Sequence, residues 1–198
     1  MAVLRLKQPA IAAADAAADE NLPLSVTRPE ILTDGSDREF RRLIHRMLIG
    51  QARLDAIRES IAARIGVSGT QYTMLMSVLH LQGSAGVSIG ALADYLEVTG
   101  PHVTGIVGKL VKAGFVRKAA NPNDGRGVLV KLTPAGQKKL LQAFEFIAAV
   151  NDRLFEGVGR DEYRAVANFH ARFIRNTQAT LDWIGRQPDE KRSRADDV

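Results

Sequence analysis

Basic side chains are concentrated in one short stretch of the sequence. The chain has 27 lysines and arginines and 22 acidic residues. Residues 99–132 hold six of the basic residues but only one acid, Asp124, so the rest of the chain is balanced and the whole net charge of +5 arises in this stretch. A local excess of cations is typical of a surface that binds phosphates. The stretch therefore predicts a nucleic-acid-binding surface.

Side chains that hold metals or act as nucleophiles show no suitable spacing. His45, His80 and His170 lie on different predicted helices, with no pair at i and i+4. The absence of cysteine rules out disulfides and thiolate metal sites and fits a reducing compartment. The sequence has no glycine-rich phosphate cradle after a strand and no nucleophile elbow. We therefore expect no enzyme activity, no metal and no cofactor.

The elements that position the basic stretch begin with helices. Apolar residues at helical spacing predict one long helix from Asp37 to about residue 64, roughly 40 Å in length. Ser68 and Gln71 form a capping-box pattern, which predicts that a second helix starts there. We expect its buried stripe to consist of Tyr72, Leu75, Val78 and Leu79, and Met74 and Met76 to lie in the core or in a cleft.

Two short helices and a hairpin are predicted next. Ser88 and Thr99 stand at N-cap positions, and a tight turn at Glu97-Val98 separates the two helices. Gly114 and Phe115 predict that the second helix ends in a Schellman motif. A turn-rich segment, 121–125, between two β-prone segments predicts a hairpin. This order is typical of a winged helix-turn-helix, whereas a helical hairpin inside an ordinary core is the alternative.

The C-terminal part is predicted to be helical and to form a homodimer. Thr133 and Pro134 predict a helix that runs to about residue 156, and a last helix follows from about Arg160 to Ile184. Their apolar stripes, with that of the first long helix, exceed what one small lobe covers. The expected division is a flexible N-terminal arm (1–36), a dimerisation helix (37–66), a winged helix-turn-helix lobe (67–133), C-terminal dimerisation helices (134–185) and a polar tail (186–198).

The fold class is thus mainly α with a small β-hairpin wing, with a dimerisation lobe built from both chain ends. No apolar run reaches the ~20 residues that cross a bilayer, and the N-terminus lacks the pattern of a secretory signal. We expect a soluble, cytoplasmic protein.

The sequence resembles the MarR family of regulators, named for multiple antibiotic resistance. The most specific likeness is the wing with the start of the following helix, Asn121 to Gly136, which reads NPNDGRGVLVKLTPAG. Leu92-Ala93, Val103-Thr104, Leu110 and Gly114 are also similar, and the whole resemblance runs from about Asp37 to Leu181. It implies an obligate homodimer with interlocking terminal helices, a lobe that reads each half of a palindromic operator, and often release by a small molecule. The implied function is that of a transcriptional regulator, with repression expected.

The second short helix departs from the family pattern. Position 105 is glycine where the family usually has a basic side chain, and Gly100 and Pro101 replace polar residues. Bidentate recognition of guanine by arginine is therefore not expected from this helix, which leaves base reading to His102, Thr104 and the wing. The expected DNA-contacting residues are Ser88, Thr99, Gly100, Pro101, His102, Thr104, Gly105, Lys109, Arg117, Lys118, Asn123, Asp124 and Arg126.

Asp124 and Arg126 match the acidic and basic members of the family's wing motif. We expect Asp124 to orient Arg126 toward a phosphate or the minor groove, the alternative being an exposed turn ion pair worth about 0–1 kcal/mol.

An effector pocket is the remaining expectation. His45, Ile49 and Arg53 follow one another at i, i+4 and i+8 on one helix face, where a cation lies beside apolar surface. Tyr72, Met76 and His80 have the same spacing on the next helix and are expected to form the opposite wall. This pair of faces suits a small aromatic or other organic acid. The alternatives are a solvated Arg53 beside plain core, and a winged helix that serves protein contact or DNA architecture without sensing.

Overall fold

The computed structural model describes residues 22–121 and 124–187, and for 124–126 it describes only the backbone. The chain divides into two compact units, Met1–Ala143 and Phe144–Val198. The first unit contains η1 (Pro29–Ile31), α2 (Arg38–Ile65), α3 (Gly69–Leu81), β1 (Val87–Ser88), α4 (Ile89–Leu96), α5 (Gly100–Lys112), β2 (Val116–Asn121), β3 (Asp124–Leu132) and α6 (Pro134–Gln142). The second contains α7 (Phe144–Leu154) and α8 (Arg160–Ile184). The expected class, mainly α with a small β-wing, is confirmed.

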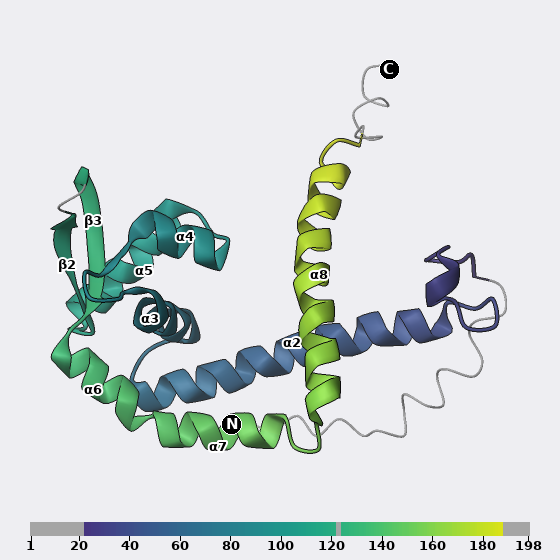
Figure 1. Ribbon diagram of the computed structural model, residues 1–198, viewed down its shortest axis with the longest axis horizontal. Coiled ribbons are helices and arrows are strands. Elements are labelled where there is room, and N and C mark those ends of the chain that lie inside the picture. Colours follow the sequence, from purple (N-terminus) through teal and green to yellow (C-terminus); the bar gives the residue numbers. More distant parts are fainter. Residues whose placement is uncertain (1–21, 122–123, 188–198) are drawn as a thin grey trace, which may run out of the picture. The chain divides into compact units, whose positions relative to one another are not determined.

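The hairpin of β2 and β3, the wing, stands beside α5 at one end of the first unit, and α2 extends away from α3 (Figure 1). The antiparallel register of β2 and β3 sets Val116 opposite Leu132 and Lys118 opposite Val130. A third strand, β1, pairs with β3, giving the sheet order β1-β3-β2. The sequence did not predict β1, because a strand of two residues has no alternation to detect.

The core of this unit lies between α3, α4, α5 and the sheet. Leu75, Leu92, Leu110 and Val130 are completely buried. Replacing one buried leucine by alanine lowers the free energy of unfolding by about 2–5 kcal/mol in such a core. Packing of these side chains holds α4 and α5 against the rest of the unit.

The prediction for the face of α3 was partly wrong. Leu75 and Val78 are buried as expected, but Tyr72 and Leu79 are only half-buried. Met74, expected in the core or in a cleft, is in the core. The reason is that α3 contacts α2, α4, α5 and β3, so that its covered face is turned from the one expected.

Local end signals position α5. Gly114 has φ of 75°, its N–H donates to the Val111 carbonyl at 3.0 Å, and the Phe115 N–H donates to the Leu110 carbonyl at 3.0 Å. These bonds confirm the Schellman motif. At the other end, Thr99 is the N-cap residue but its side chain makes no capping bond. The proline at the second helical position, Pro101, has no N–H, which removes one of the two donors that a cap accepts.

The start of α6 is fastened to the end of α5. The Thr133 hydroxyl donates to the Gly114 carbonyl at 2.7 Å and accepts from the Gly136 N–H at 2.9 Å. The Thr133 N–H donates to the Phe115 carbonyl at 2.9 Å. Gly136 lies so close to the Phe115 backbone that a β-carbon at 136 would overlap it. Glycine at this position lets α6 and the α5–β2 turn pack backbone to backbone.

The single helix expected from 133 to about 156 was wrong, because the structure has two helices there. α6 ends at Gln142 and α7 begins at Phe144, and the Ala143 N–H bonds to the Leu140 carbonyl three residues back. A bond of this kind tightens the last turn of a helix. No glycine or proline marks the break, so the sequence has no local signal for it.

Residues 22–36, expected to be part of a flexible arm, are hydrogen-bonded to the first turn of α2. The Asp37 carboxylate, 4% exposed, accepts from the Ser25 hydroxyl at 2.5 Å, the Ser25 N–H at 2.6 Å and the Arg41 guanidinium at 2.8 Å. Arg41 also donates to the Pro23 carbonyl. The Ser25 and Arg41 hydrogen bonds hold the pKa of Asp37 far below its usual range.

We predict that Asp37→Asn loosens this segment while leaving the rest of the fold intact. A lowered pKa means that the carboxylate stabilises the fold above the ordinary carboxyl pKa and loses this effect only in strong acid, so the anchor is fully present near neutral pH. Hydrogen exchange of amides 25–37, measured by mass spectrometry, should speed up about tenfold or more. Asp34→Asn, at a turn residue with φ of 50°, is the control that should leave exchange unchanged. Equal protection in both variants would contradict the anchoring role.

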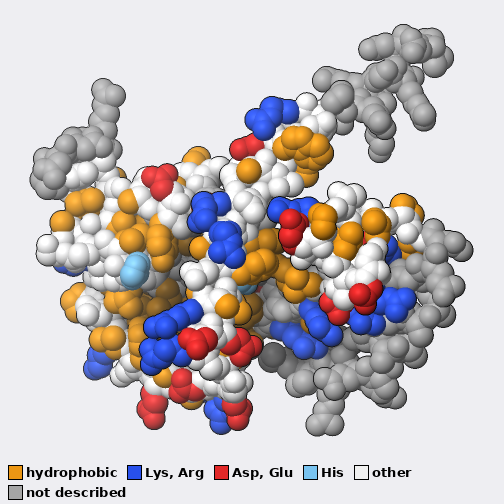
Figure 2. Space-filling model, turned by 45° about the vertical axis from the view of Figure 1, so that its right-hand side comes forward, with side chains coloured by type: hydrophobic (Ala, Val, Ile, Leu, Met, Phe, Trp, Pro, Cys, Tyr) orange, Lys and Arg blue, Asp and Glu red, His pale blue; other side chains and the backbone are white. Residues whose placement is uncertain are grey.

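Apolar side chains of the second unit remain largely open. α8 has no buried residue, and Leu181, Trp183 and Ile184 are each more than half exposed. Figure 2 shows many hydrophobic side chains open on the visible face of the chain. Among the described residues, no helix is long and apolar enough to span a membrane.

Candidate nucleic-acid interface

The interface begins with α5, which separates its residues sharply into two faces. Val103, Ile106, Val107 and Leu110 are buried. The outward side carries the residues predicted from the sequence: Pro101, His102, Thr104, Gly105 and Lys109 are exposed, and Gly100 is half-buried. The face predicted to meet DNA is therefore open to solvent.

The turn before α5 is set by one left-handed residue. Glu97 has φ of 52°, and the Val98 N–H bonds back to the Ala93 carbonyl at 3.0 Å. Ser88 caps α4 by accepting from the Ala91 N–H at 3.1 Å, and it is half-buried. Thr99 is exposed beside the start of α5. Hydroxyls at the N-terminal ends of α4 and α5 thus lie near backbone N–H groups, an arrangement that favours anions.

The wing adds cations to the same lobe. Arg117 and Lys118 are exposed on β2, and Arg117 is paired in register with Lys131 on β3. Like charges directly opposite each other repel. The Lys131 ammonium is held by the Ser84 carbonyl at 2.5 Å, a contact 47 residues apart in sequence that no local pattern predicts. A phosphate near Arg117 would relieve this repulsion.

Three predicted wing residues lie outside what the structure describes. Asn123 is not described, and for Asp124 and Arg126 only the backbone of β3 is. The expected orientation of Arg126 by Asp124 therefore stays a prediction.

The six residues of the expected effector pocket lie on α2 and α3, two helices that contact each other. Ile49, Tyr72 and Met76 are half-buried, whereas His45, Arg53 and His80 are exposed. Within the described residues, no hydrogen bond, ion pair or ring contact links the three on α2 to the three on α3. His80 instead lies against Tyr95, with ring centroids 5.9 Å apart. Partial burial raises the pKa of the Tyr72 phenol.

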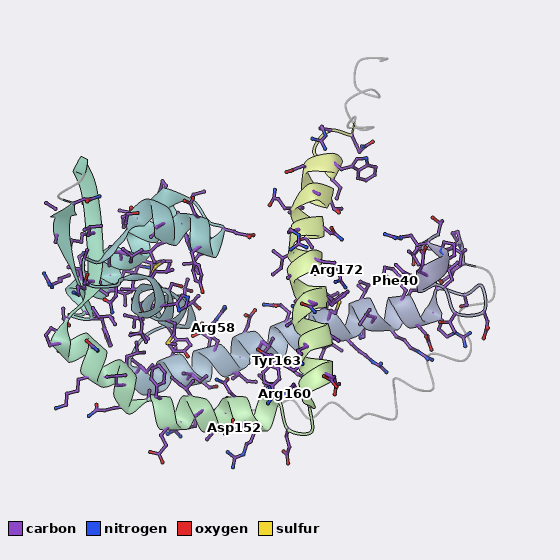
Figure 3. The ribbon with its side chains drawn as sticks, in the orientation of Figure 1. Phe40, Arg58, Asp152, Arg160, Tyr163 and Arg172 are labelled. Carbon is purple, nitrogen blue, oxygen red and sulfur yellow. The ribbon has the colours of Figure 1, made fainter. Side chains whose placement is uncertain are left out.

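Two surface hollows lie elsewhere. One, of about 540 Å³, runs along α6 past Pro134, Lys138 and Leu141. The other, of about 330 Å³, lies before and within the first turn of α8, where Arg160 and Tyr163 project (Figure 3). Neither includes any of the six residues. In residues 22–121 and 124–187, no three histidine or acidic side chains are grouped as metal ligands.

The fold and the exposed cationic face of α5 and the wing define a winged helix-turn-helix protein of the DNA-binding class. Known proteins agree with this class. The model of the MarR family matches residues 65–127, from the end of α2 into the wing. Over this segment the chain is similar to the MarR family of DNA-binding transcriptional regulators.

Relatives with known names show how far the likeness extends. The multiple antibiotic resistance protein MarR of Escherichia coli is 27% identical over 143 residues, which are 72% of this chain and 85% of that protein. The transcriptional activatory protein BadR of Rhodopseudomonas palustris is 28% identical over 46% of this chain and 50% of its own length. A crystal structure of an E. coli MarR mutant complexed with operator DNA has a TM-score of 0.57 and 26% identity, covering 67% of this chain and 94% of that one.

Proposed function

We propose that the protein is a repressor that binds a palindromic operator as a homodimer and is released by a small organic effector. The observation that carries the proposal is the open cationic face of α5 and β2, in which Lys109, Arg117 and Lys118 are all exposed. The proposed contacts fall into two groups. The residues proposed to contact DNA phosphates are Ser88, Thr99, Lys109, Arg117, Lys118, Asn123 and Arg126. The base-reading group comprises His102 and Thr104, with Gly100, Pro101 and Gly105 at the helix surface.

Selection from a pool of random-sequence duplexes, followed by footprinting, tests this function. We expect one palindromic sequence to be enriched, with its half-sites centred about 34–36 Å apart, one helical turn, or a multiple of that distance. Enrichment without a palindrome would favour an architectural winged helix, and no enrichment would favour a protein-interaction module. Because BadR carries the name of an activator, a promoter-reporter assay is needed to decide between repression and activation. Deletion of the gene should raise expression if the protein represses.

We predict that the chain is a dimer in solution. The proposed partner surface is a second copy, which would cover the open apolar residues of α8 and the exposed Leu43, Leu48 and Leu54 of α2. In this arrangement 37–66 and 134–185 supply the dimerisation helices. Light scattering at micromolar concentration should give about twice 21.5 kDa. A stable folded monomer at that concentration would defeat the two-fold operator model.

The effector proposal rests on α2 and α3. Arg53 offers a cation and Ile49 and Met76 offer apolar surface, which together suit an aromatic or other organic acid. A ligand there would change the angle between the two DNA-reading lobes of the dimer, and a modest rotation breaks the register with two half-sites.

We predict that Arg53→Ala and Tyr72→Ala each weaken the response to such an acid about tenfold, measured as DNA release by fluorescence anisotropy. Salicylate and benzoate are suitable probes, and Arg172→Ala, a substitution on α8, is the control. If an acid releases DNA from both variants as it does from the unchanged protein, the effector site lies elsewhere.

A further inference from the structure

The outward face of α5 has no side chain at two positions where a helix lying in a groove comes closest to the bases. The direction opposite the four buried residues of α5 follows from a rotation of about 100° per residue. Pro101, Gly105, Gly108 and Lys112 lie along that direction, and the two glycines occupy its middle. The inference drawn from them rests on DNA binding by this face, as proposed above.

The fold itself does not require either glycine. A β-carbon at Gly105 or Gly108 would meet nothing within 4 Å, and neither residue has a positive φ. Glycine inside a helix is less stable than alanine, because the unfolded chain gains more freedom. Two such residues in a helix of 13 residues therefore lower the stability of α5, and no contact within this chain requires them. A close approach from outside would account for them.

Groove dimensions supply the reason for a close approach. A helix with its side chains is about 10–12 Å across, nearly the width of the major groove at about 12 Å. The Cα atoms lie only about 2.3 Å from the helix axis. A face without side chains can therefore bring the backbone to the base edges, which a longer side chain at 105 or 108 would prevent.

The side chains on the two flanks are the ones left to contact the DNA. Thr104 lies on one side of the glycines, and His102 and Lys109 lie on the other. All three are exposed, and none of their side chains makes a hydrogen bond or ion pair with a residue that the structure describes. We propose that α5 seats with the backbone of Gly105 and Gly108 against the base edges, so that Thr104 and His102 are the specificity-determining side chains.

Alanine at each glycine tests this seating. The variants are Gly105→Ala, Gly108→Ala and, as a matched control, Gly50→Ala in α2, another helical glycine with nothing within 4 Å of its β-carbon position. Each variant's melting temperature, its affinity for the selected palindrome and its affinity for a scrambled duplex are measured at one salt concentration. All three variants should melt about 2–4 °C higher.

Gly105→Ala and Gly108→Ala should bind the palindrome at least about tenfold more weakly, yet bind the scrambled duplex within about twofold of the unchanged protein, because phosphate contacts persist. Gly50→Ala, which lies on the proposed dimerisation helix and not on α5, should keep the same ratio of affinities for the palindrome and the scrambled duplex as the unchanged protein. His102→Ala and Thr104→Ala should alter the preferred bases in a repeated selection. If the unchanged protein prefers no sequence, the proposed function itself fails. If it does prefer one and the two alanine variants bind it normally, only the seating of α5 is overturned.

Discussion

Replacing Lys109, Arg117 and Lys118 together by glutamine should lower the affinity for DNA about a thousandfold or more at 0.1 M salt. A homodimer would lose six cations, and each phosphate contact contributes about 0.9 to the slope of log affinity against log salt. The slope should therefore become shallower by about 5. Base-specific contacts of α5 would remain, but they cannot replace the release of counterions that drives the approach to DNA.

The substitutions are designed to leave the fold unchanged. All three side chains are exposed, and surface changes of this kind usually alter stability by less than about 0.5 kcal/mol each. The matched control removes the same three charges elsewhere, in Lys138→Gln, Arg153→Gln and Arg186→Gln. Titration by fluorescence anisotropy at several salt concentrations compares the two triple variants. Similar losses in both would mean that net charge matters and that the face of α5 and the wing does not.

Gly136→Ala should destabilise the DNA-reading lobe by about 3 kcal/mol or more. An added β-carbon would overlap the Phe115 carbonyl, and the obstacle is backbone, which cannot rotate away. Helix propensity acts in the opposite direction, since alanine is about 1 kcal/mol better than glycine inside a helix. The sign of the change therefore separates the two effects.

Thermal unfolding followed by circular dichroism measures this sign. We expect the melting temperature of Gly136→Ala to fall by about 6–12 °C. Gly50→Ala, with open space around its β-carbon position, should rise instead. A rise in Gly136→Ala as well would show that α6 does not pack backbone to backbone against the α5–β2 turn.

Much of the DNA-reading lobe, the winged helix-turn-helix segment 67–133, is predictable from the sequence because short-range signals determine it. The capping box of Ser68 and Gln71 is present in full, and the Schellman end of α5 at Gly114 forms as expected. Outside this lobe, the apolar period also predicted the last helix, which runs from Arg160 to Ile184 as expected. Each of these features depends on residues within one or two turns, so the printed order of residues contains the information.

Contacts between distant segments were not predictable in the same way. The Asp37–Ser25 anchor and the Lys131–Ser84 bond join residues whose proximity depends on the complete fold. β1 is too short to show alternation, and the break at Ala143 has no glycine or proline. For the candidate site, the exposed face of α5 followed from its apolar period. The facing of α2 and α3 expected for the effector depends on a crossing that periodicity does not determine.

The most direct test of DNA recognition by the DNA-reading lobe is to measure the affinity of the full chain for its selected palindrome and for a scrambled duplex across a range of salt concentrations. The account predicts that the palindrome is bound about a thousandfold or more tightly than the scrambled sequence near physiological salt. It also predicts a slope of about −5 to −7 in log affinity against log salt, as expected for six to eight neutralised phosphates. Equal affinity for the two duplexes, or an affinity that does not change with salt, would contradict it.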